Sequence, residues 1–493
     1  MLSFATISLD ATKRLHNKHT HHMLAILFLA FPGAPSTKLG DSKLAEVGTS
    51  SAAAATLHRA LALSDWTKTI RRDLHKCPEL LYNLDETSAY VRKTLDELKI
   101  PYVFPVATNG IVATIGTGSS PCVGLRADMD ALPILEEVEG PFRSRTEGKM
   151  HACGHDAHTA MLLTAARILK EREAQLAGTV KLIFQPAEEG GAGGLAMVQA
   201  GLLEALPKIE RVFALHVWPG FPAGTVHSMP NTIMAAAGFY HANFIGHGGH
   251  AAMPHTTVDP FTCVATAQLG LQTIISRNLS PIDAGVVSTT FIKGGSAYNI
   301  IPGTVELGGT IRSLSRAGYR FLDEKVRGVL QGAAAVGGCT LNLTTSSLEY
   351  DCLEQPIPPG APGACTFPPT VNEPNAYRLA KGAAISLVGD ERYDDCSSTM
   401  GGEDFAYLLE KVPGAMMFLG IGNHTLGTDV NLHNPKFQMD EAQMHLGAAL
   451  HVEMALRSLA TPVGSAKPCA TSSMTGEGGL ASCAEGTNIE GED

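Results

Sequence analysis

The feature that most constrains the fold is a regular alternation of short apolar runs and longer segments with helical periodicity. Apolar runs at 111–115, 123–125, 180–184 and 212–215 are separated by segments in which apolar residues recur every three or four positions. This alternation predicts an α/β domain with a central, mostly parallel sheet covered by helices. Polar clusters follow several of the predicted strands. Because ligands bind at the carboxyl edge of such sheets, we expect a functional site there.

The alternation of predicted strands and helices changes after about residue 237. The order of predicted elements becomes β-α-β-β-α-β, with strands at 240–245, 286–292, 305–311 and 340–346 and helices at 258–277 and 320–336. This order is typical of a ferredoxin-like α+β unit. The α/β pattern then resumes, with a helix at 376–387 and a strand at 416–419. The sequence therefore predicts a second domain inserted into the first.

Composition excludes some classes of function. With 493 residues the chain is too long for a single core, and its net charge of −11 argues against a nucleic-acid-binding protein. Ten cysteines are scattered without a Cys-x-x-Cys pair, which predicts neither a zinc ribbon nor a disulfide scaffold. Most of these cysteines are expected to be buried thiols.

The N-terminal residues resemble a targeting segment. Lys13, Arg14 and Lys18 precede an apolar run at 23–31, an order typical of a secretory signal. A transit peptide is the alternative, because acidic residues are rare in this region. We favour the secretory pathway or endoplasmic reticulum over a plastid or the cytoplasm. The run is shorter than the ~20 residues of a membrane-spanning helix, so no stable membrane span is predicted.

The stretch from Met150 to His158 carries a thiol, three imidazoles and a carboxylate. Gly154 separates Cys153 from His155 and allows a tight bend that turns both side chains toward one point. An apolar-periodic helix follows to about residue 173. A polar cluster on the N-terminus of a rigid helix is a usual support for a metal or nucleophile site. Taken alone, a Cys-x-His pair is weak evidence for either.

Glu188 and Glu189 form a second cluster at a predicted strand end. Adjacent carboxylates repel each other unless a cation lies between them, so a solvated loop or a metal site both fit the pair. In the metal interpretation one acid binds metal and the other moves protons. His216 and His433 are candidate further ligands, although isolated histidines are more often structural. Thiolate, imidazole and carboxylate together suit Zn²⁺ or Mn²⁺.

Six motifs occur together and in order, and they carry a family resemblance. They are Leu125–Ile134, His151–His158, Phe184–Gly191, Gly246–His255, Gly294–Gly303 and Gly402–Ala406. The chain resembles the amidohydrolase branch of the aminoacylase/carboxypeptidase-G-like metallopeptidase superfamily. Within that branch it is most similar to the IAA-amino acid hydrolase and hippurate hydrolase group, over roughly residues 60–460.

The resemblance implies a centre of two divalent metal ions, Mn²⁺ in preference to Zn²⁺. The metal ligands it implies are Cys153, His155, Glu189, His216 and His433.

It also implies roles for four further residues. Glu188 is the catalytic acid–base, and His250 is a histidine of the inserted domain that polarises the substrate carbonyl. Asn299 and Arg312 receive the substrate carboxylate. The expected reaction is cleavage of the amide bond of an N-acyl amino acid by metal-activated water, with Glu188 as general base. The expected partners are this small-molecule substrate and a second copy of the chain, bound through the inserted domain.

The domain organisation follows from the pattern and the resemblance together. We expect a targeting segment and linker at 1–57, a catalytic α/β domain at 58–237 and 351–460, an inserted lid or dimerisation domain at 238–350, and a disordered acidic tail at 461–493.

Several alternatives stay open at this point. A metallo-dipeptidase or carboxypeptidase would use the same centre, since substrate choice depends on pocket shape. A thiol amidase with Cys153 as nucleophile leaves Glu188, Glu189, His216 and His433 unexplained, and a non-enzymatic metal-binding protein is a third possibility. Asp128 and Asp130 are either structural acids or groups that orient the ligands.

A disulfide is expected only under one condition. If the protein is secreted, Cys352 and Cys365 can pair, and the Asn278-Leu279-Ser280 sequon is compatible with that route.

Overall fold

The computed structural model describes residues 51–354 and 363–461. The predicted targeting segment and acidic tail, apart from a few residues at their inner ends, lie outside the described residues. Within the described ranges, no helix is both long and apolar enough to cross a bilayer.

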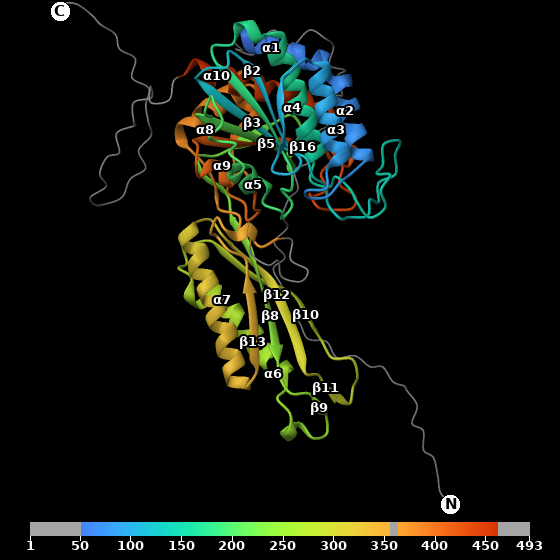
Figure 1. The fold of residues 1–493 in the computed structure, drawn as a ribbon, viewed down its shortest axis with the longest axis vertical. Coiled ribbons are helices and arrows are strands. Elements are labelled where there is room, and N and C mark those ends of the chain that lie inside the picture. Colours follow the sequence, from blue (N-terminus) through green and yellow to red (C-terminus); the bar gives the residue numbers. More distant parts are fainter. Residues whose placement is uncertain (1–50, 355–362, 462–493) are drawn as a thin grey trace, which may run out of the picture. The chain divides into compact units, whose positions relative to one another are not determined.

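A large mixed sheet forms the centre of the first domain (Figure 1). The pairings of β3 with β4 and β5, and of β5 with β16, are parallel, so these strands end at the same edge of the sheet. In spatial order, the eight strands assigned within the described residues are β1 (Tyr102–Val106), β2 (Gly110–Gly116), β4 (Thr179–Gln185), β3 (Cys122–Asp128), β5 (Arg211–Pro222), β16 (Gly414–Gly422), β6 (Val226–Ser228) and β15 (Tyr393–Asp395).

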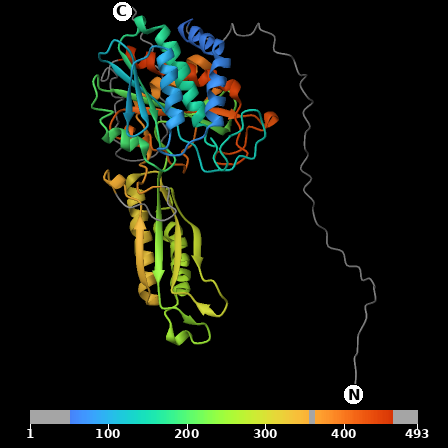
Figure 2. The same ribbon diagram turned by 45° about the vertical axis from the view of Figure 1, so that its right-hand side comes forward.

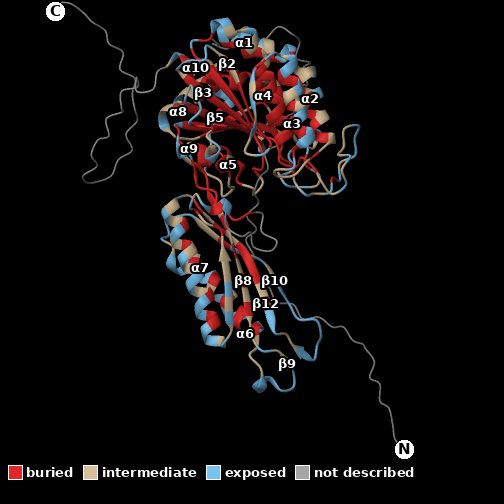
Figure 3. Cartoon of the chain, in the orientation of Figure 1, coloured by how far each residue is buried: buried red, intermediate tan, exposed pale blue. Residues whose placement is uncertain are grey.

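Both faces of this sheet are covered, which explains why its strands are nearly continuous apolar runs. Along β2, Ile111, Ala113 and Ile115 belong to one hydrophobic core and Val112 to the other. Figure 3 shows the central strands and α4 coloured as buried along most of their length. The first core takes in α1 (Ser51–Ala62), α2 (Ser64–Lys76), α3 (Asp85–Glu97), α4 (His155–Glu171), α8 (Pro374–Val388) and α10 (Met444–Ala460). The second takes in α5 (Gly193–Gln199) and α9 (Ala406–Leu409).

The inserted domain is the ferredoxin-like unit that the sequence predicts. Its antiparallel sheet has the strand order β10-β12-β8-β13, and α6 and α7 bury their apolar residues against one face of it (Figures 1 and 2). The elements, in chain order, are β8 (Ala236–Ile245), α6 (Pro260–Thr273), β10 (Gly285–Gly294), β12 (Thr304–Ser313), α7 (Arg316–Gly337) and β13 (Thr340–Thr345). A separate two-stranded ribbon joins β9 (Gly249–His250) to β11 (Ile300–Ile301).

Some elements differ from expectation. Helix α1 begins at Ser51, so residues 51–57 are helical where a linker was expected. The helix predicted over 258–277 begins at Pro260, because Asp259 accepts a hydrogen bond from Phe261 N as its N-cap, and it ends in a π-helical turn, Ile274–Asn278. Strand β5 continues past the apolar run to Pro222.

The cysteines correct one prediction and agree with another. Cys263 is bonded to Cys339 and Cys352 to Cys365; the first bond was not expected, since most of the cysteines were predicted to be buried thiols. The pairing of Cys352 with Cys365 is the one that the sequence allowed. Cys77, Cys122, Cys153 and Cys396 are free.

Candidate metal centre and substrate pocket

The Cys153-Gly154-His155 turn lies at the start of α4. Gly154 has a φ of 93°, and a Cβ on it would lie 2.4 Å from Val217 Cγ2, so this position requires glycine. His155 Nδ1 donates to the carbonyl oxygen of Asp130 at 2.8 Å, which directs Nε2 toward the interior of the site. Cys153 Sγ lies 3.4 Å from His216 Nε2.

Asp130 positions the two adjacent glutamates. Its carboxylate accepts hydrogen bonds from the backbone N–H of Glu188 at 2.9 Å and of Glu189 at 3.1 Å. His155 Nε2 lies 4.0 Å from Glu188 Oε2 and 3.9 Å from Glu189 Oε1. One aspartate therefore orients both the acidic loop and the histidine, which favours the ligand-orienting interpretation of this residue.

Asp128, at the end of β3, holds a different histidine. It accepts from His158 Nδ1 at 2.6 Å, while His158 Nε2 accepts from the backbone N–H of Val217 at 3.0 Å. Both nitrogens of His158 are thereby engaged, and this histidine serves as a structural link between α4 and β5.

His216 and His433 reach the same place from distant parts of the chain. His216 Nδ1 donates to the carbonyl oxygen of Val217, leaving Nε2 directed toward Cys153. His433 has a left-handed φ of 62°, and its backbone N–H donates to Ala152 O at 2.8 Å. Its Nε2 lies 3.3 Å from Glu189 Oε1. A strained backbone conformation thus brings His433 beside the Cys153 turn.

These side chains fit divalent metal ions. His155 Nε2 and Glu189 Oε1 are buried and make no hydrogen bond within the structure. Among the described residues, five groups of three possible ligands have ligand atoms within 4.8 Å of one another. Three of them consist of residues singled out from the sequence: Cys153 with His155 and His216, Cys153 with Glu189 and His433, and His155 with Glu188 and Glu189. Buried polar atoms without a hydrogen-bond partner destabilise the folded state unless another group, such as a metal ion, binds them. The mixture of sulfur, imidazole nitrogen and carboxylate oxygen is a normal ligand set for Zn²⁺ and similar ions.

Burial and neighbouring carboxylates raise the pKa of both the Cys153 thiol and the Glu188 carboxyl group. Burial, together with Glu189 and Glu188, raises the pKa of the Cys153 thiol well above its usual range. Burial, together with Glu403 and Glu189, also raises the pKa of Glu188 well above its usual range. Both shifts arise because burial and neighbouring carboxylates disfavour further negative charge, a cost that a bound cation would offset.

The candidate metal ligands open into a cavity of about 780 Å³ that both domains line. The first domain contributes Cys153, Glu188, Glu189, His216 and His433 to it, and the inserted domain contributes Arg312 with Thr310 and Phe239. Arg312 makes no ion pair with any described residue, and burial lowers the pKa of its guanidinium. Apolar side chains line the rest of the cavity, notably Leu132, Trp218, Met234, Phe367 and Met400.

His250 and Asn299 lie outside this cavity. Both are exposed on the β9–β11 ribbon and neither lines the cavity. Arg312 pairs with Ala237 at one end of β8, whereas His250 follows the other end, Ile245. Nine residues of strand span about 27 Å, so Arg312 and His250 lie far apart within one chain.

One buried cluster beside the cavity was not assigned from the sequence. Arg126 Nη2 lies 2.9 Å from both Glu403 Oε1 and Asp404 Oδ1, and Arg126 Nη1 lies 2.6 Å from Asp128. Gln185 also donates to Asp404. The acids belong to the Gly402–Ala406 motif, which contributed to the resemblance without roles for its members. Two adjacent acids in an apolar setting were the signal that could have identified them.

Comparison with known proteins identifies the family of this chain. Residues 124–457 match the family model described as peptidase family M20/M25/M40. IAA-amino acid hydrolase ILR1-like 4 of Arabidopsis thaliana is 41% identical over 395 residues, covering 80% of this chain and 86% of the relative. N-acetylcysteine deacetylase of Bacillus subtilis is 34% identical over 394 residues, covering 80% and 96%.

Solved structures show the same architecture. The Bacillus subtilis YXEP protein, described as a dinuclear metal binding peptidase from the M20 family, aligns with a TM-score of 0.65 and 30% identity, over 81% of this chain and 99% of its own. The family match covers both the Cys153-Gly154-His155 turn and the inserted domain. The chain therefore belongs to the M20/M25/M40 peptidase family and is a metal-dependent amidohydrolase.

Proposed function

We propose that this protein hydrolyses the amide bond of N-acyl amino acids, of the IAA-amino acid conjugate or hippurate type. The observation that carries the proposal is Arg312, a cation without an acidic partner among the described residues, in the same cavity as the metal-binding side chains. A guanidinium can pair bidentately with a carboxylate, so the cavity suits an amide whose leaving group is a free amino acid. The similarity to plant IAA-amino acid hydrolases supports this substrate class.

Two divalent ions would be held by Cys153, His155, Glu189, His216 and His433, and we favour Mn²⁺ over Zn²⁺. The relative described as dinuclear supports the number of ions. Bound ions of this kind polarise the amide carbonyl and lower the pKa of water.

Glu188 moves the proton in this proposal. Its backbone is fixed by Asp130, and its side chain lines the cavity 4.0 Å from His155 Nε2 without being one of the five ligands. Its carboxylate takes a proton from the attacking water as the new C–O bond forms. The same proton then passes to the leaving nitrogen as the C–N bond breaks, releasing the carboxylic acid and the amino acid.

The acyl group would lie against apolar side chains that line the cavity. Trp218, Met234 and Met400 present a surface suited to an aromatic or alkyl acyl chain.

His250 and Asn299 complete the site in this proposal from a second copy of the chain. Because the lid sheet separates them from Arg312 by about 27 Å, one rigid lid cannot place all three at one substrate. A homodimer formed through the inserted domain would supply His250 to the carbonyl oxygen and Asn299 to the carboxylate.

A substrate panel tests the proposal. Purified protein is assayed with Mn²⁺ or Zn²⁺ against N-acyl amino acids, the same compounds with an amidated carboxyl group, and dipeptides. We expect hydrolysis of the first set, with much weaker activity on the amidated compounds. Preferential cleavage of dipeptides would instead support a metallo-dipeptidase with the same centre.

A further inference from the structure

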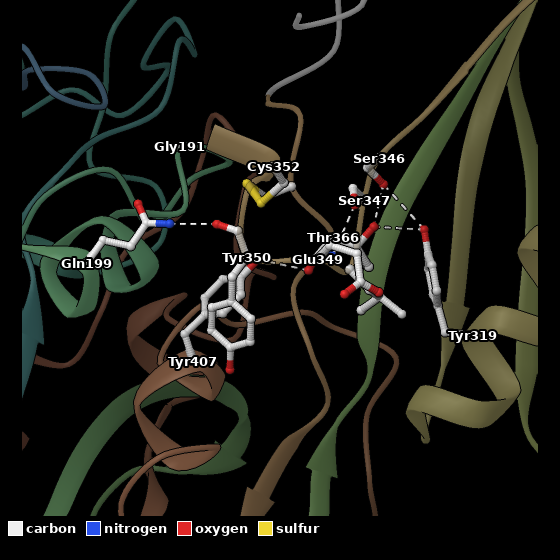
Figure 4. The surroundings of a disulfide bond; sticks show 12 residues. Gly191, Gln199, Tyr319, Ser346, Ser347, Glu349, Tyr350, Cys352, Thr366 and Tyr407 are labelled. Carbon is white, nitrogen blue, oxygen red and sulfur yellow. Dashed lines mark hydrogen bonds between the residues drawn. A yellow bond between two sulfur atoms is a disulfide. The ribbon is translucent and has the colours of Figure 1, made fainter. Parts of the chain in front are cut away.

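The Cys352–Cys365 disulfide and the residues around it are shown in Figure 4. Cys365 lines the cavity, whereas Cys352 is fully buried. The two cysteines share a small apolar cluster with Ala192 and Leu195, near the start of α5, and with Tyr407 of α9. These two helices follow the Glu188–Glu189 loop and the Glu403–Asp404 loop. The disulfide is therefore packed against the supports of both acidic loops.

The segment 363–367 forms a wall between the two ends of the cavity. At one end, a Cβ on Gly363 would lie 2.0 Å from the carbonyl oxygen of Gly190, next to Glu189. At the other end, Phe367 exchanges two backbone hydrogen bonds with Ala237, the residue that pairs with Arg312. The wall thus runs from the metal-binding acids to the guanidinium.

Several contacts keep this wall in place. Ser347 donates to Ala364 O and accepts from Thr366 N. Tyr407 donates from its hydroxyl group to Thr366 O at 2.9 Å, and Thr366 belongs to a buried hydroxyl cluster with Ser346 and Tyr319 (Figure 4). Within the wall itself, the disulfide is the covalent tie, joining Cys365 to Cys352 of the 3₁₀ turn Cys352–Glu354.

We propose that the Cys352–Cys365 disulfide determines which amino acids the enzyme accepts, by fixing the wall at 363–367. This inference rests on the proposed function, in which the scissile amide lies at the metal centre and the carboxylate at Arg312. The amino-acid portion of the substrate then lies between them, alongside the wall. A fixed wall limits the size of the amino-acid side chain and lowers the entropic cost of ordering the pocket on binding.

The second disulfide provides a matched control. Cys263–Cys339 lies within the inserted domain and neither cysteine lines the cavity. It closes 76 residues, against 13 for Cys352–Cys365, so its loss should cost more stability. If general destabilisation changed specificity, C263S/C339S would show the larger effect.

The experiment compares the full-length protein, C352S/C365S, C263S/C339S and G363A, with the disulfides verified by peptide mass spectrometry. G363A removes no cysteine, and its Cβ would lie 2.0 Å from Gly190 O, so we expect it to displace segment 363–367 from Gly190 with both disulfides intact. For each protein we measure metal content, thermal midpoint, and kcat and KM for acetyl-glycine, acetyl-alanine and acetyl-phenylalanine. A second series varies the acyl group on alanine.

We expect C352S/C365S and G363A to move the phenylalanine-to-alanine ratio of kcat/KM by about three- to tenfold toward the larger side chain. Metal content and the acyl-group ratios should change less than about twofold. C263S/C339S should lose more thermal stability and keep the parent ratios. Unchanged amino-acid ratios in C352S/C365S and G363A, or equal shifts in C263S/C339S, would overturn the proposal.

Failure of the proposed function is distinguishable from failure of this inference. If the parent protein hydrolyses no N-acyl amino acid, the proposed substrate is wrong. Hydrogen exchange then decides the role of the disulfide. If the disulfide fixes segment 363–367, backbone amides at 364–367 and 188–191 should exchange faster in C352S/C365S than in C263S/C339S. Equal exchange rates in the two variants would contradict this role of the disulfide.

Discussion

His155 Nε2 lies 3.9 Å from Glu189 Oε1, and neither buried atom has a hydrogen-bond partner within the structure. Each unpartnered buried group of this kind costs about 1–3 kcal/mol. A divalent cation bound by both atoms would remove that cost and offset the charge of the acidic loop. Metal binding should therefore contribute to stability as well as to activity.

Metal removal is the first prediction. Prolonged chelation should abolish hydrolysis and lower the thermal midpoint, and added Mn²⁺ or Zn²⁺ should restore both. Activity assays and calorimetry on the same samples provide the test. If chelation left activity intact while alkylation of the metal-loaded enzyme abolished it, Cys153 would be the nucleophile.

The second prediction concerns Glu188. Glu188→Gln should bind metal as the parent does, because Asp130 fixes this loop through its backbone. It should nevertheless lower kcat by about 10²–10⁴-fold, since glutamine cannot accept the proton. Metal analysis and kcat measured in parallel test this, and near-normal kcat at full occupancy would assign the proton transfer to another group.

Much of the architecture was predictable because periodicity reports burial. The order β-α-β-β-α-β predicted the inserted domain, and the position of polar clusters after strands predicted that Asp128, Glu188 and His216 would meet at one edge. His433 could be connected to this edge only through the family resemblance, because its left-handed turn has no periodic signal.

Other features depend on contacts that single positions do not encode. A cysteine in α6 carries no information about its partner, which is why Cys263–Cys339 was missed. The apolar lining of the cavity could not be predicted for the same reason, because Trp218, Met234 and Met400 come from segments far apart in the sequence. Residues 51–57, the first part of helix α1, were predicted to be linker because they are small and uncharged.

The third prediction concerns Arg312. Arg312→Ala should raise KM for N-acyl amino acids by about 10- to 100-fold, the effect of losing a charge-assisted bidentate pair. The amidated substrates, which lack the carboxylate, should be affected little by the same change. Steady-state kinetics on both substrates tests this, and equal losses would mean that Arg312 acts on the fold of the pocket.

The fourth prediction concerns His250 and its position at the far end of the lid sheet. His250→Ala and Glu188→Gln should each be nearly inactive. When the two variants are co-expressed, about half of the dimers should contain one chain of each. In such a dimer one of the two sites has both Glu188 and His250, so about a quarter of the parent activity should return. Size measurement must show a dimer. A mixture without activity would place His250 in its own chain or outside catalysis.

The last prediction concerns the pH dependence of stability, through a buried network beside the metal-binding helix. His75 Nδ1 lies 2.7 Å from Asp156 Oδ2, and His75 Nε2 lies 3.3 Å from Glu136 Oε1. Burial and Arg71 lower the pKa of His75, but Asp156 and Glu136 raise it more, so the net pKa lies above the ordinary 6.5. The protonated imidazole therefore stabilises the folded state.

Its stabilising contribution is fully present below pH 6.5 and is lost as pH rises through the higher folded-state pKa. His75→Gln should lower the free energy of unfolding by about 2–3 kcal/mol at pH 6, the cost of disrupting buried charged hydrogen bonds, and by less at pH 9. Denaturant unfolding of metal-saturated protein at the two pH values measures this. His255→Gln, at an exposed turn of the inserted domain, is the control and should change stability at neither pH. A loss in His75→Gln that is equal at pH 6 and pH 9 would mean that the histidine is neutral in the folded protein.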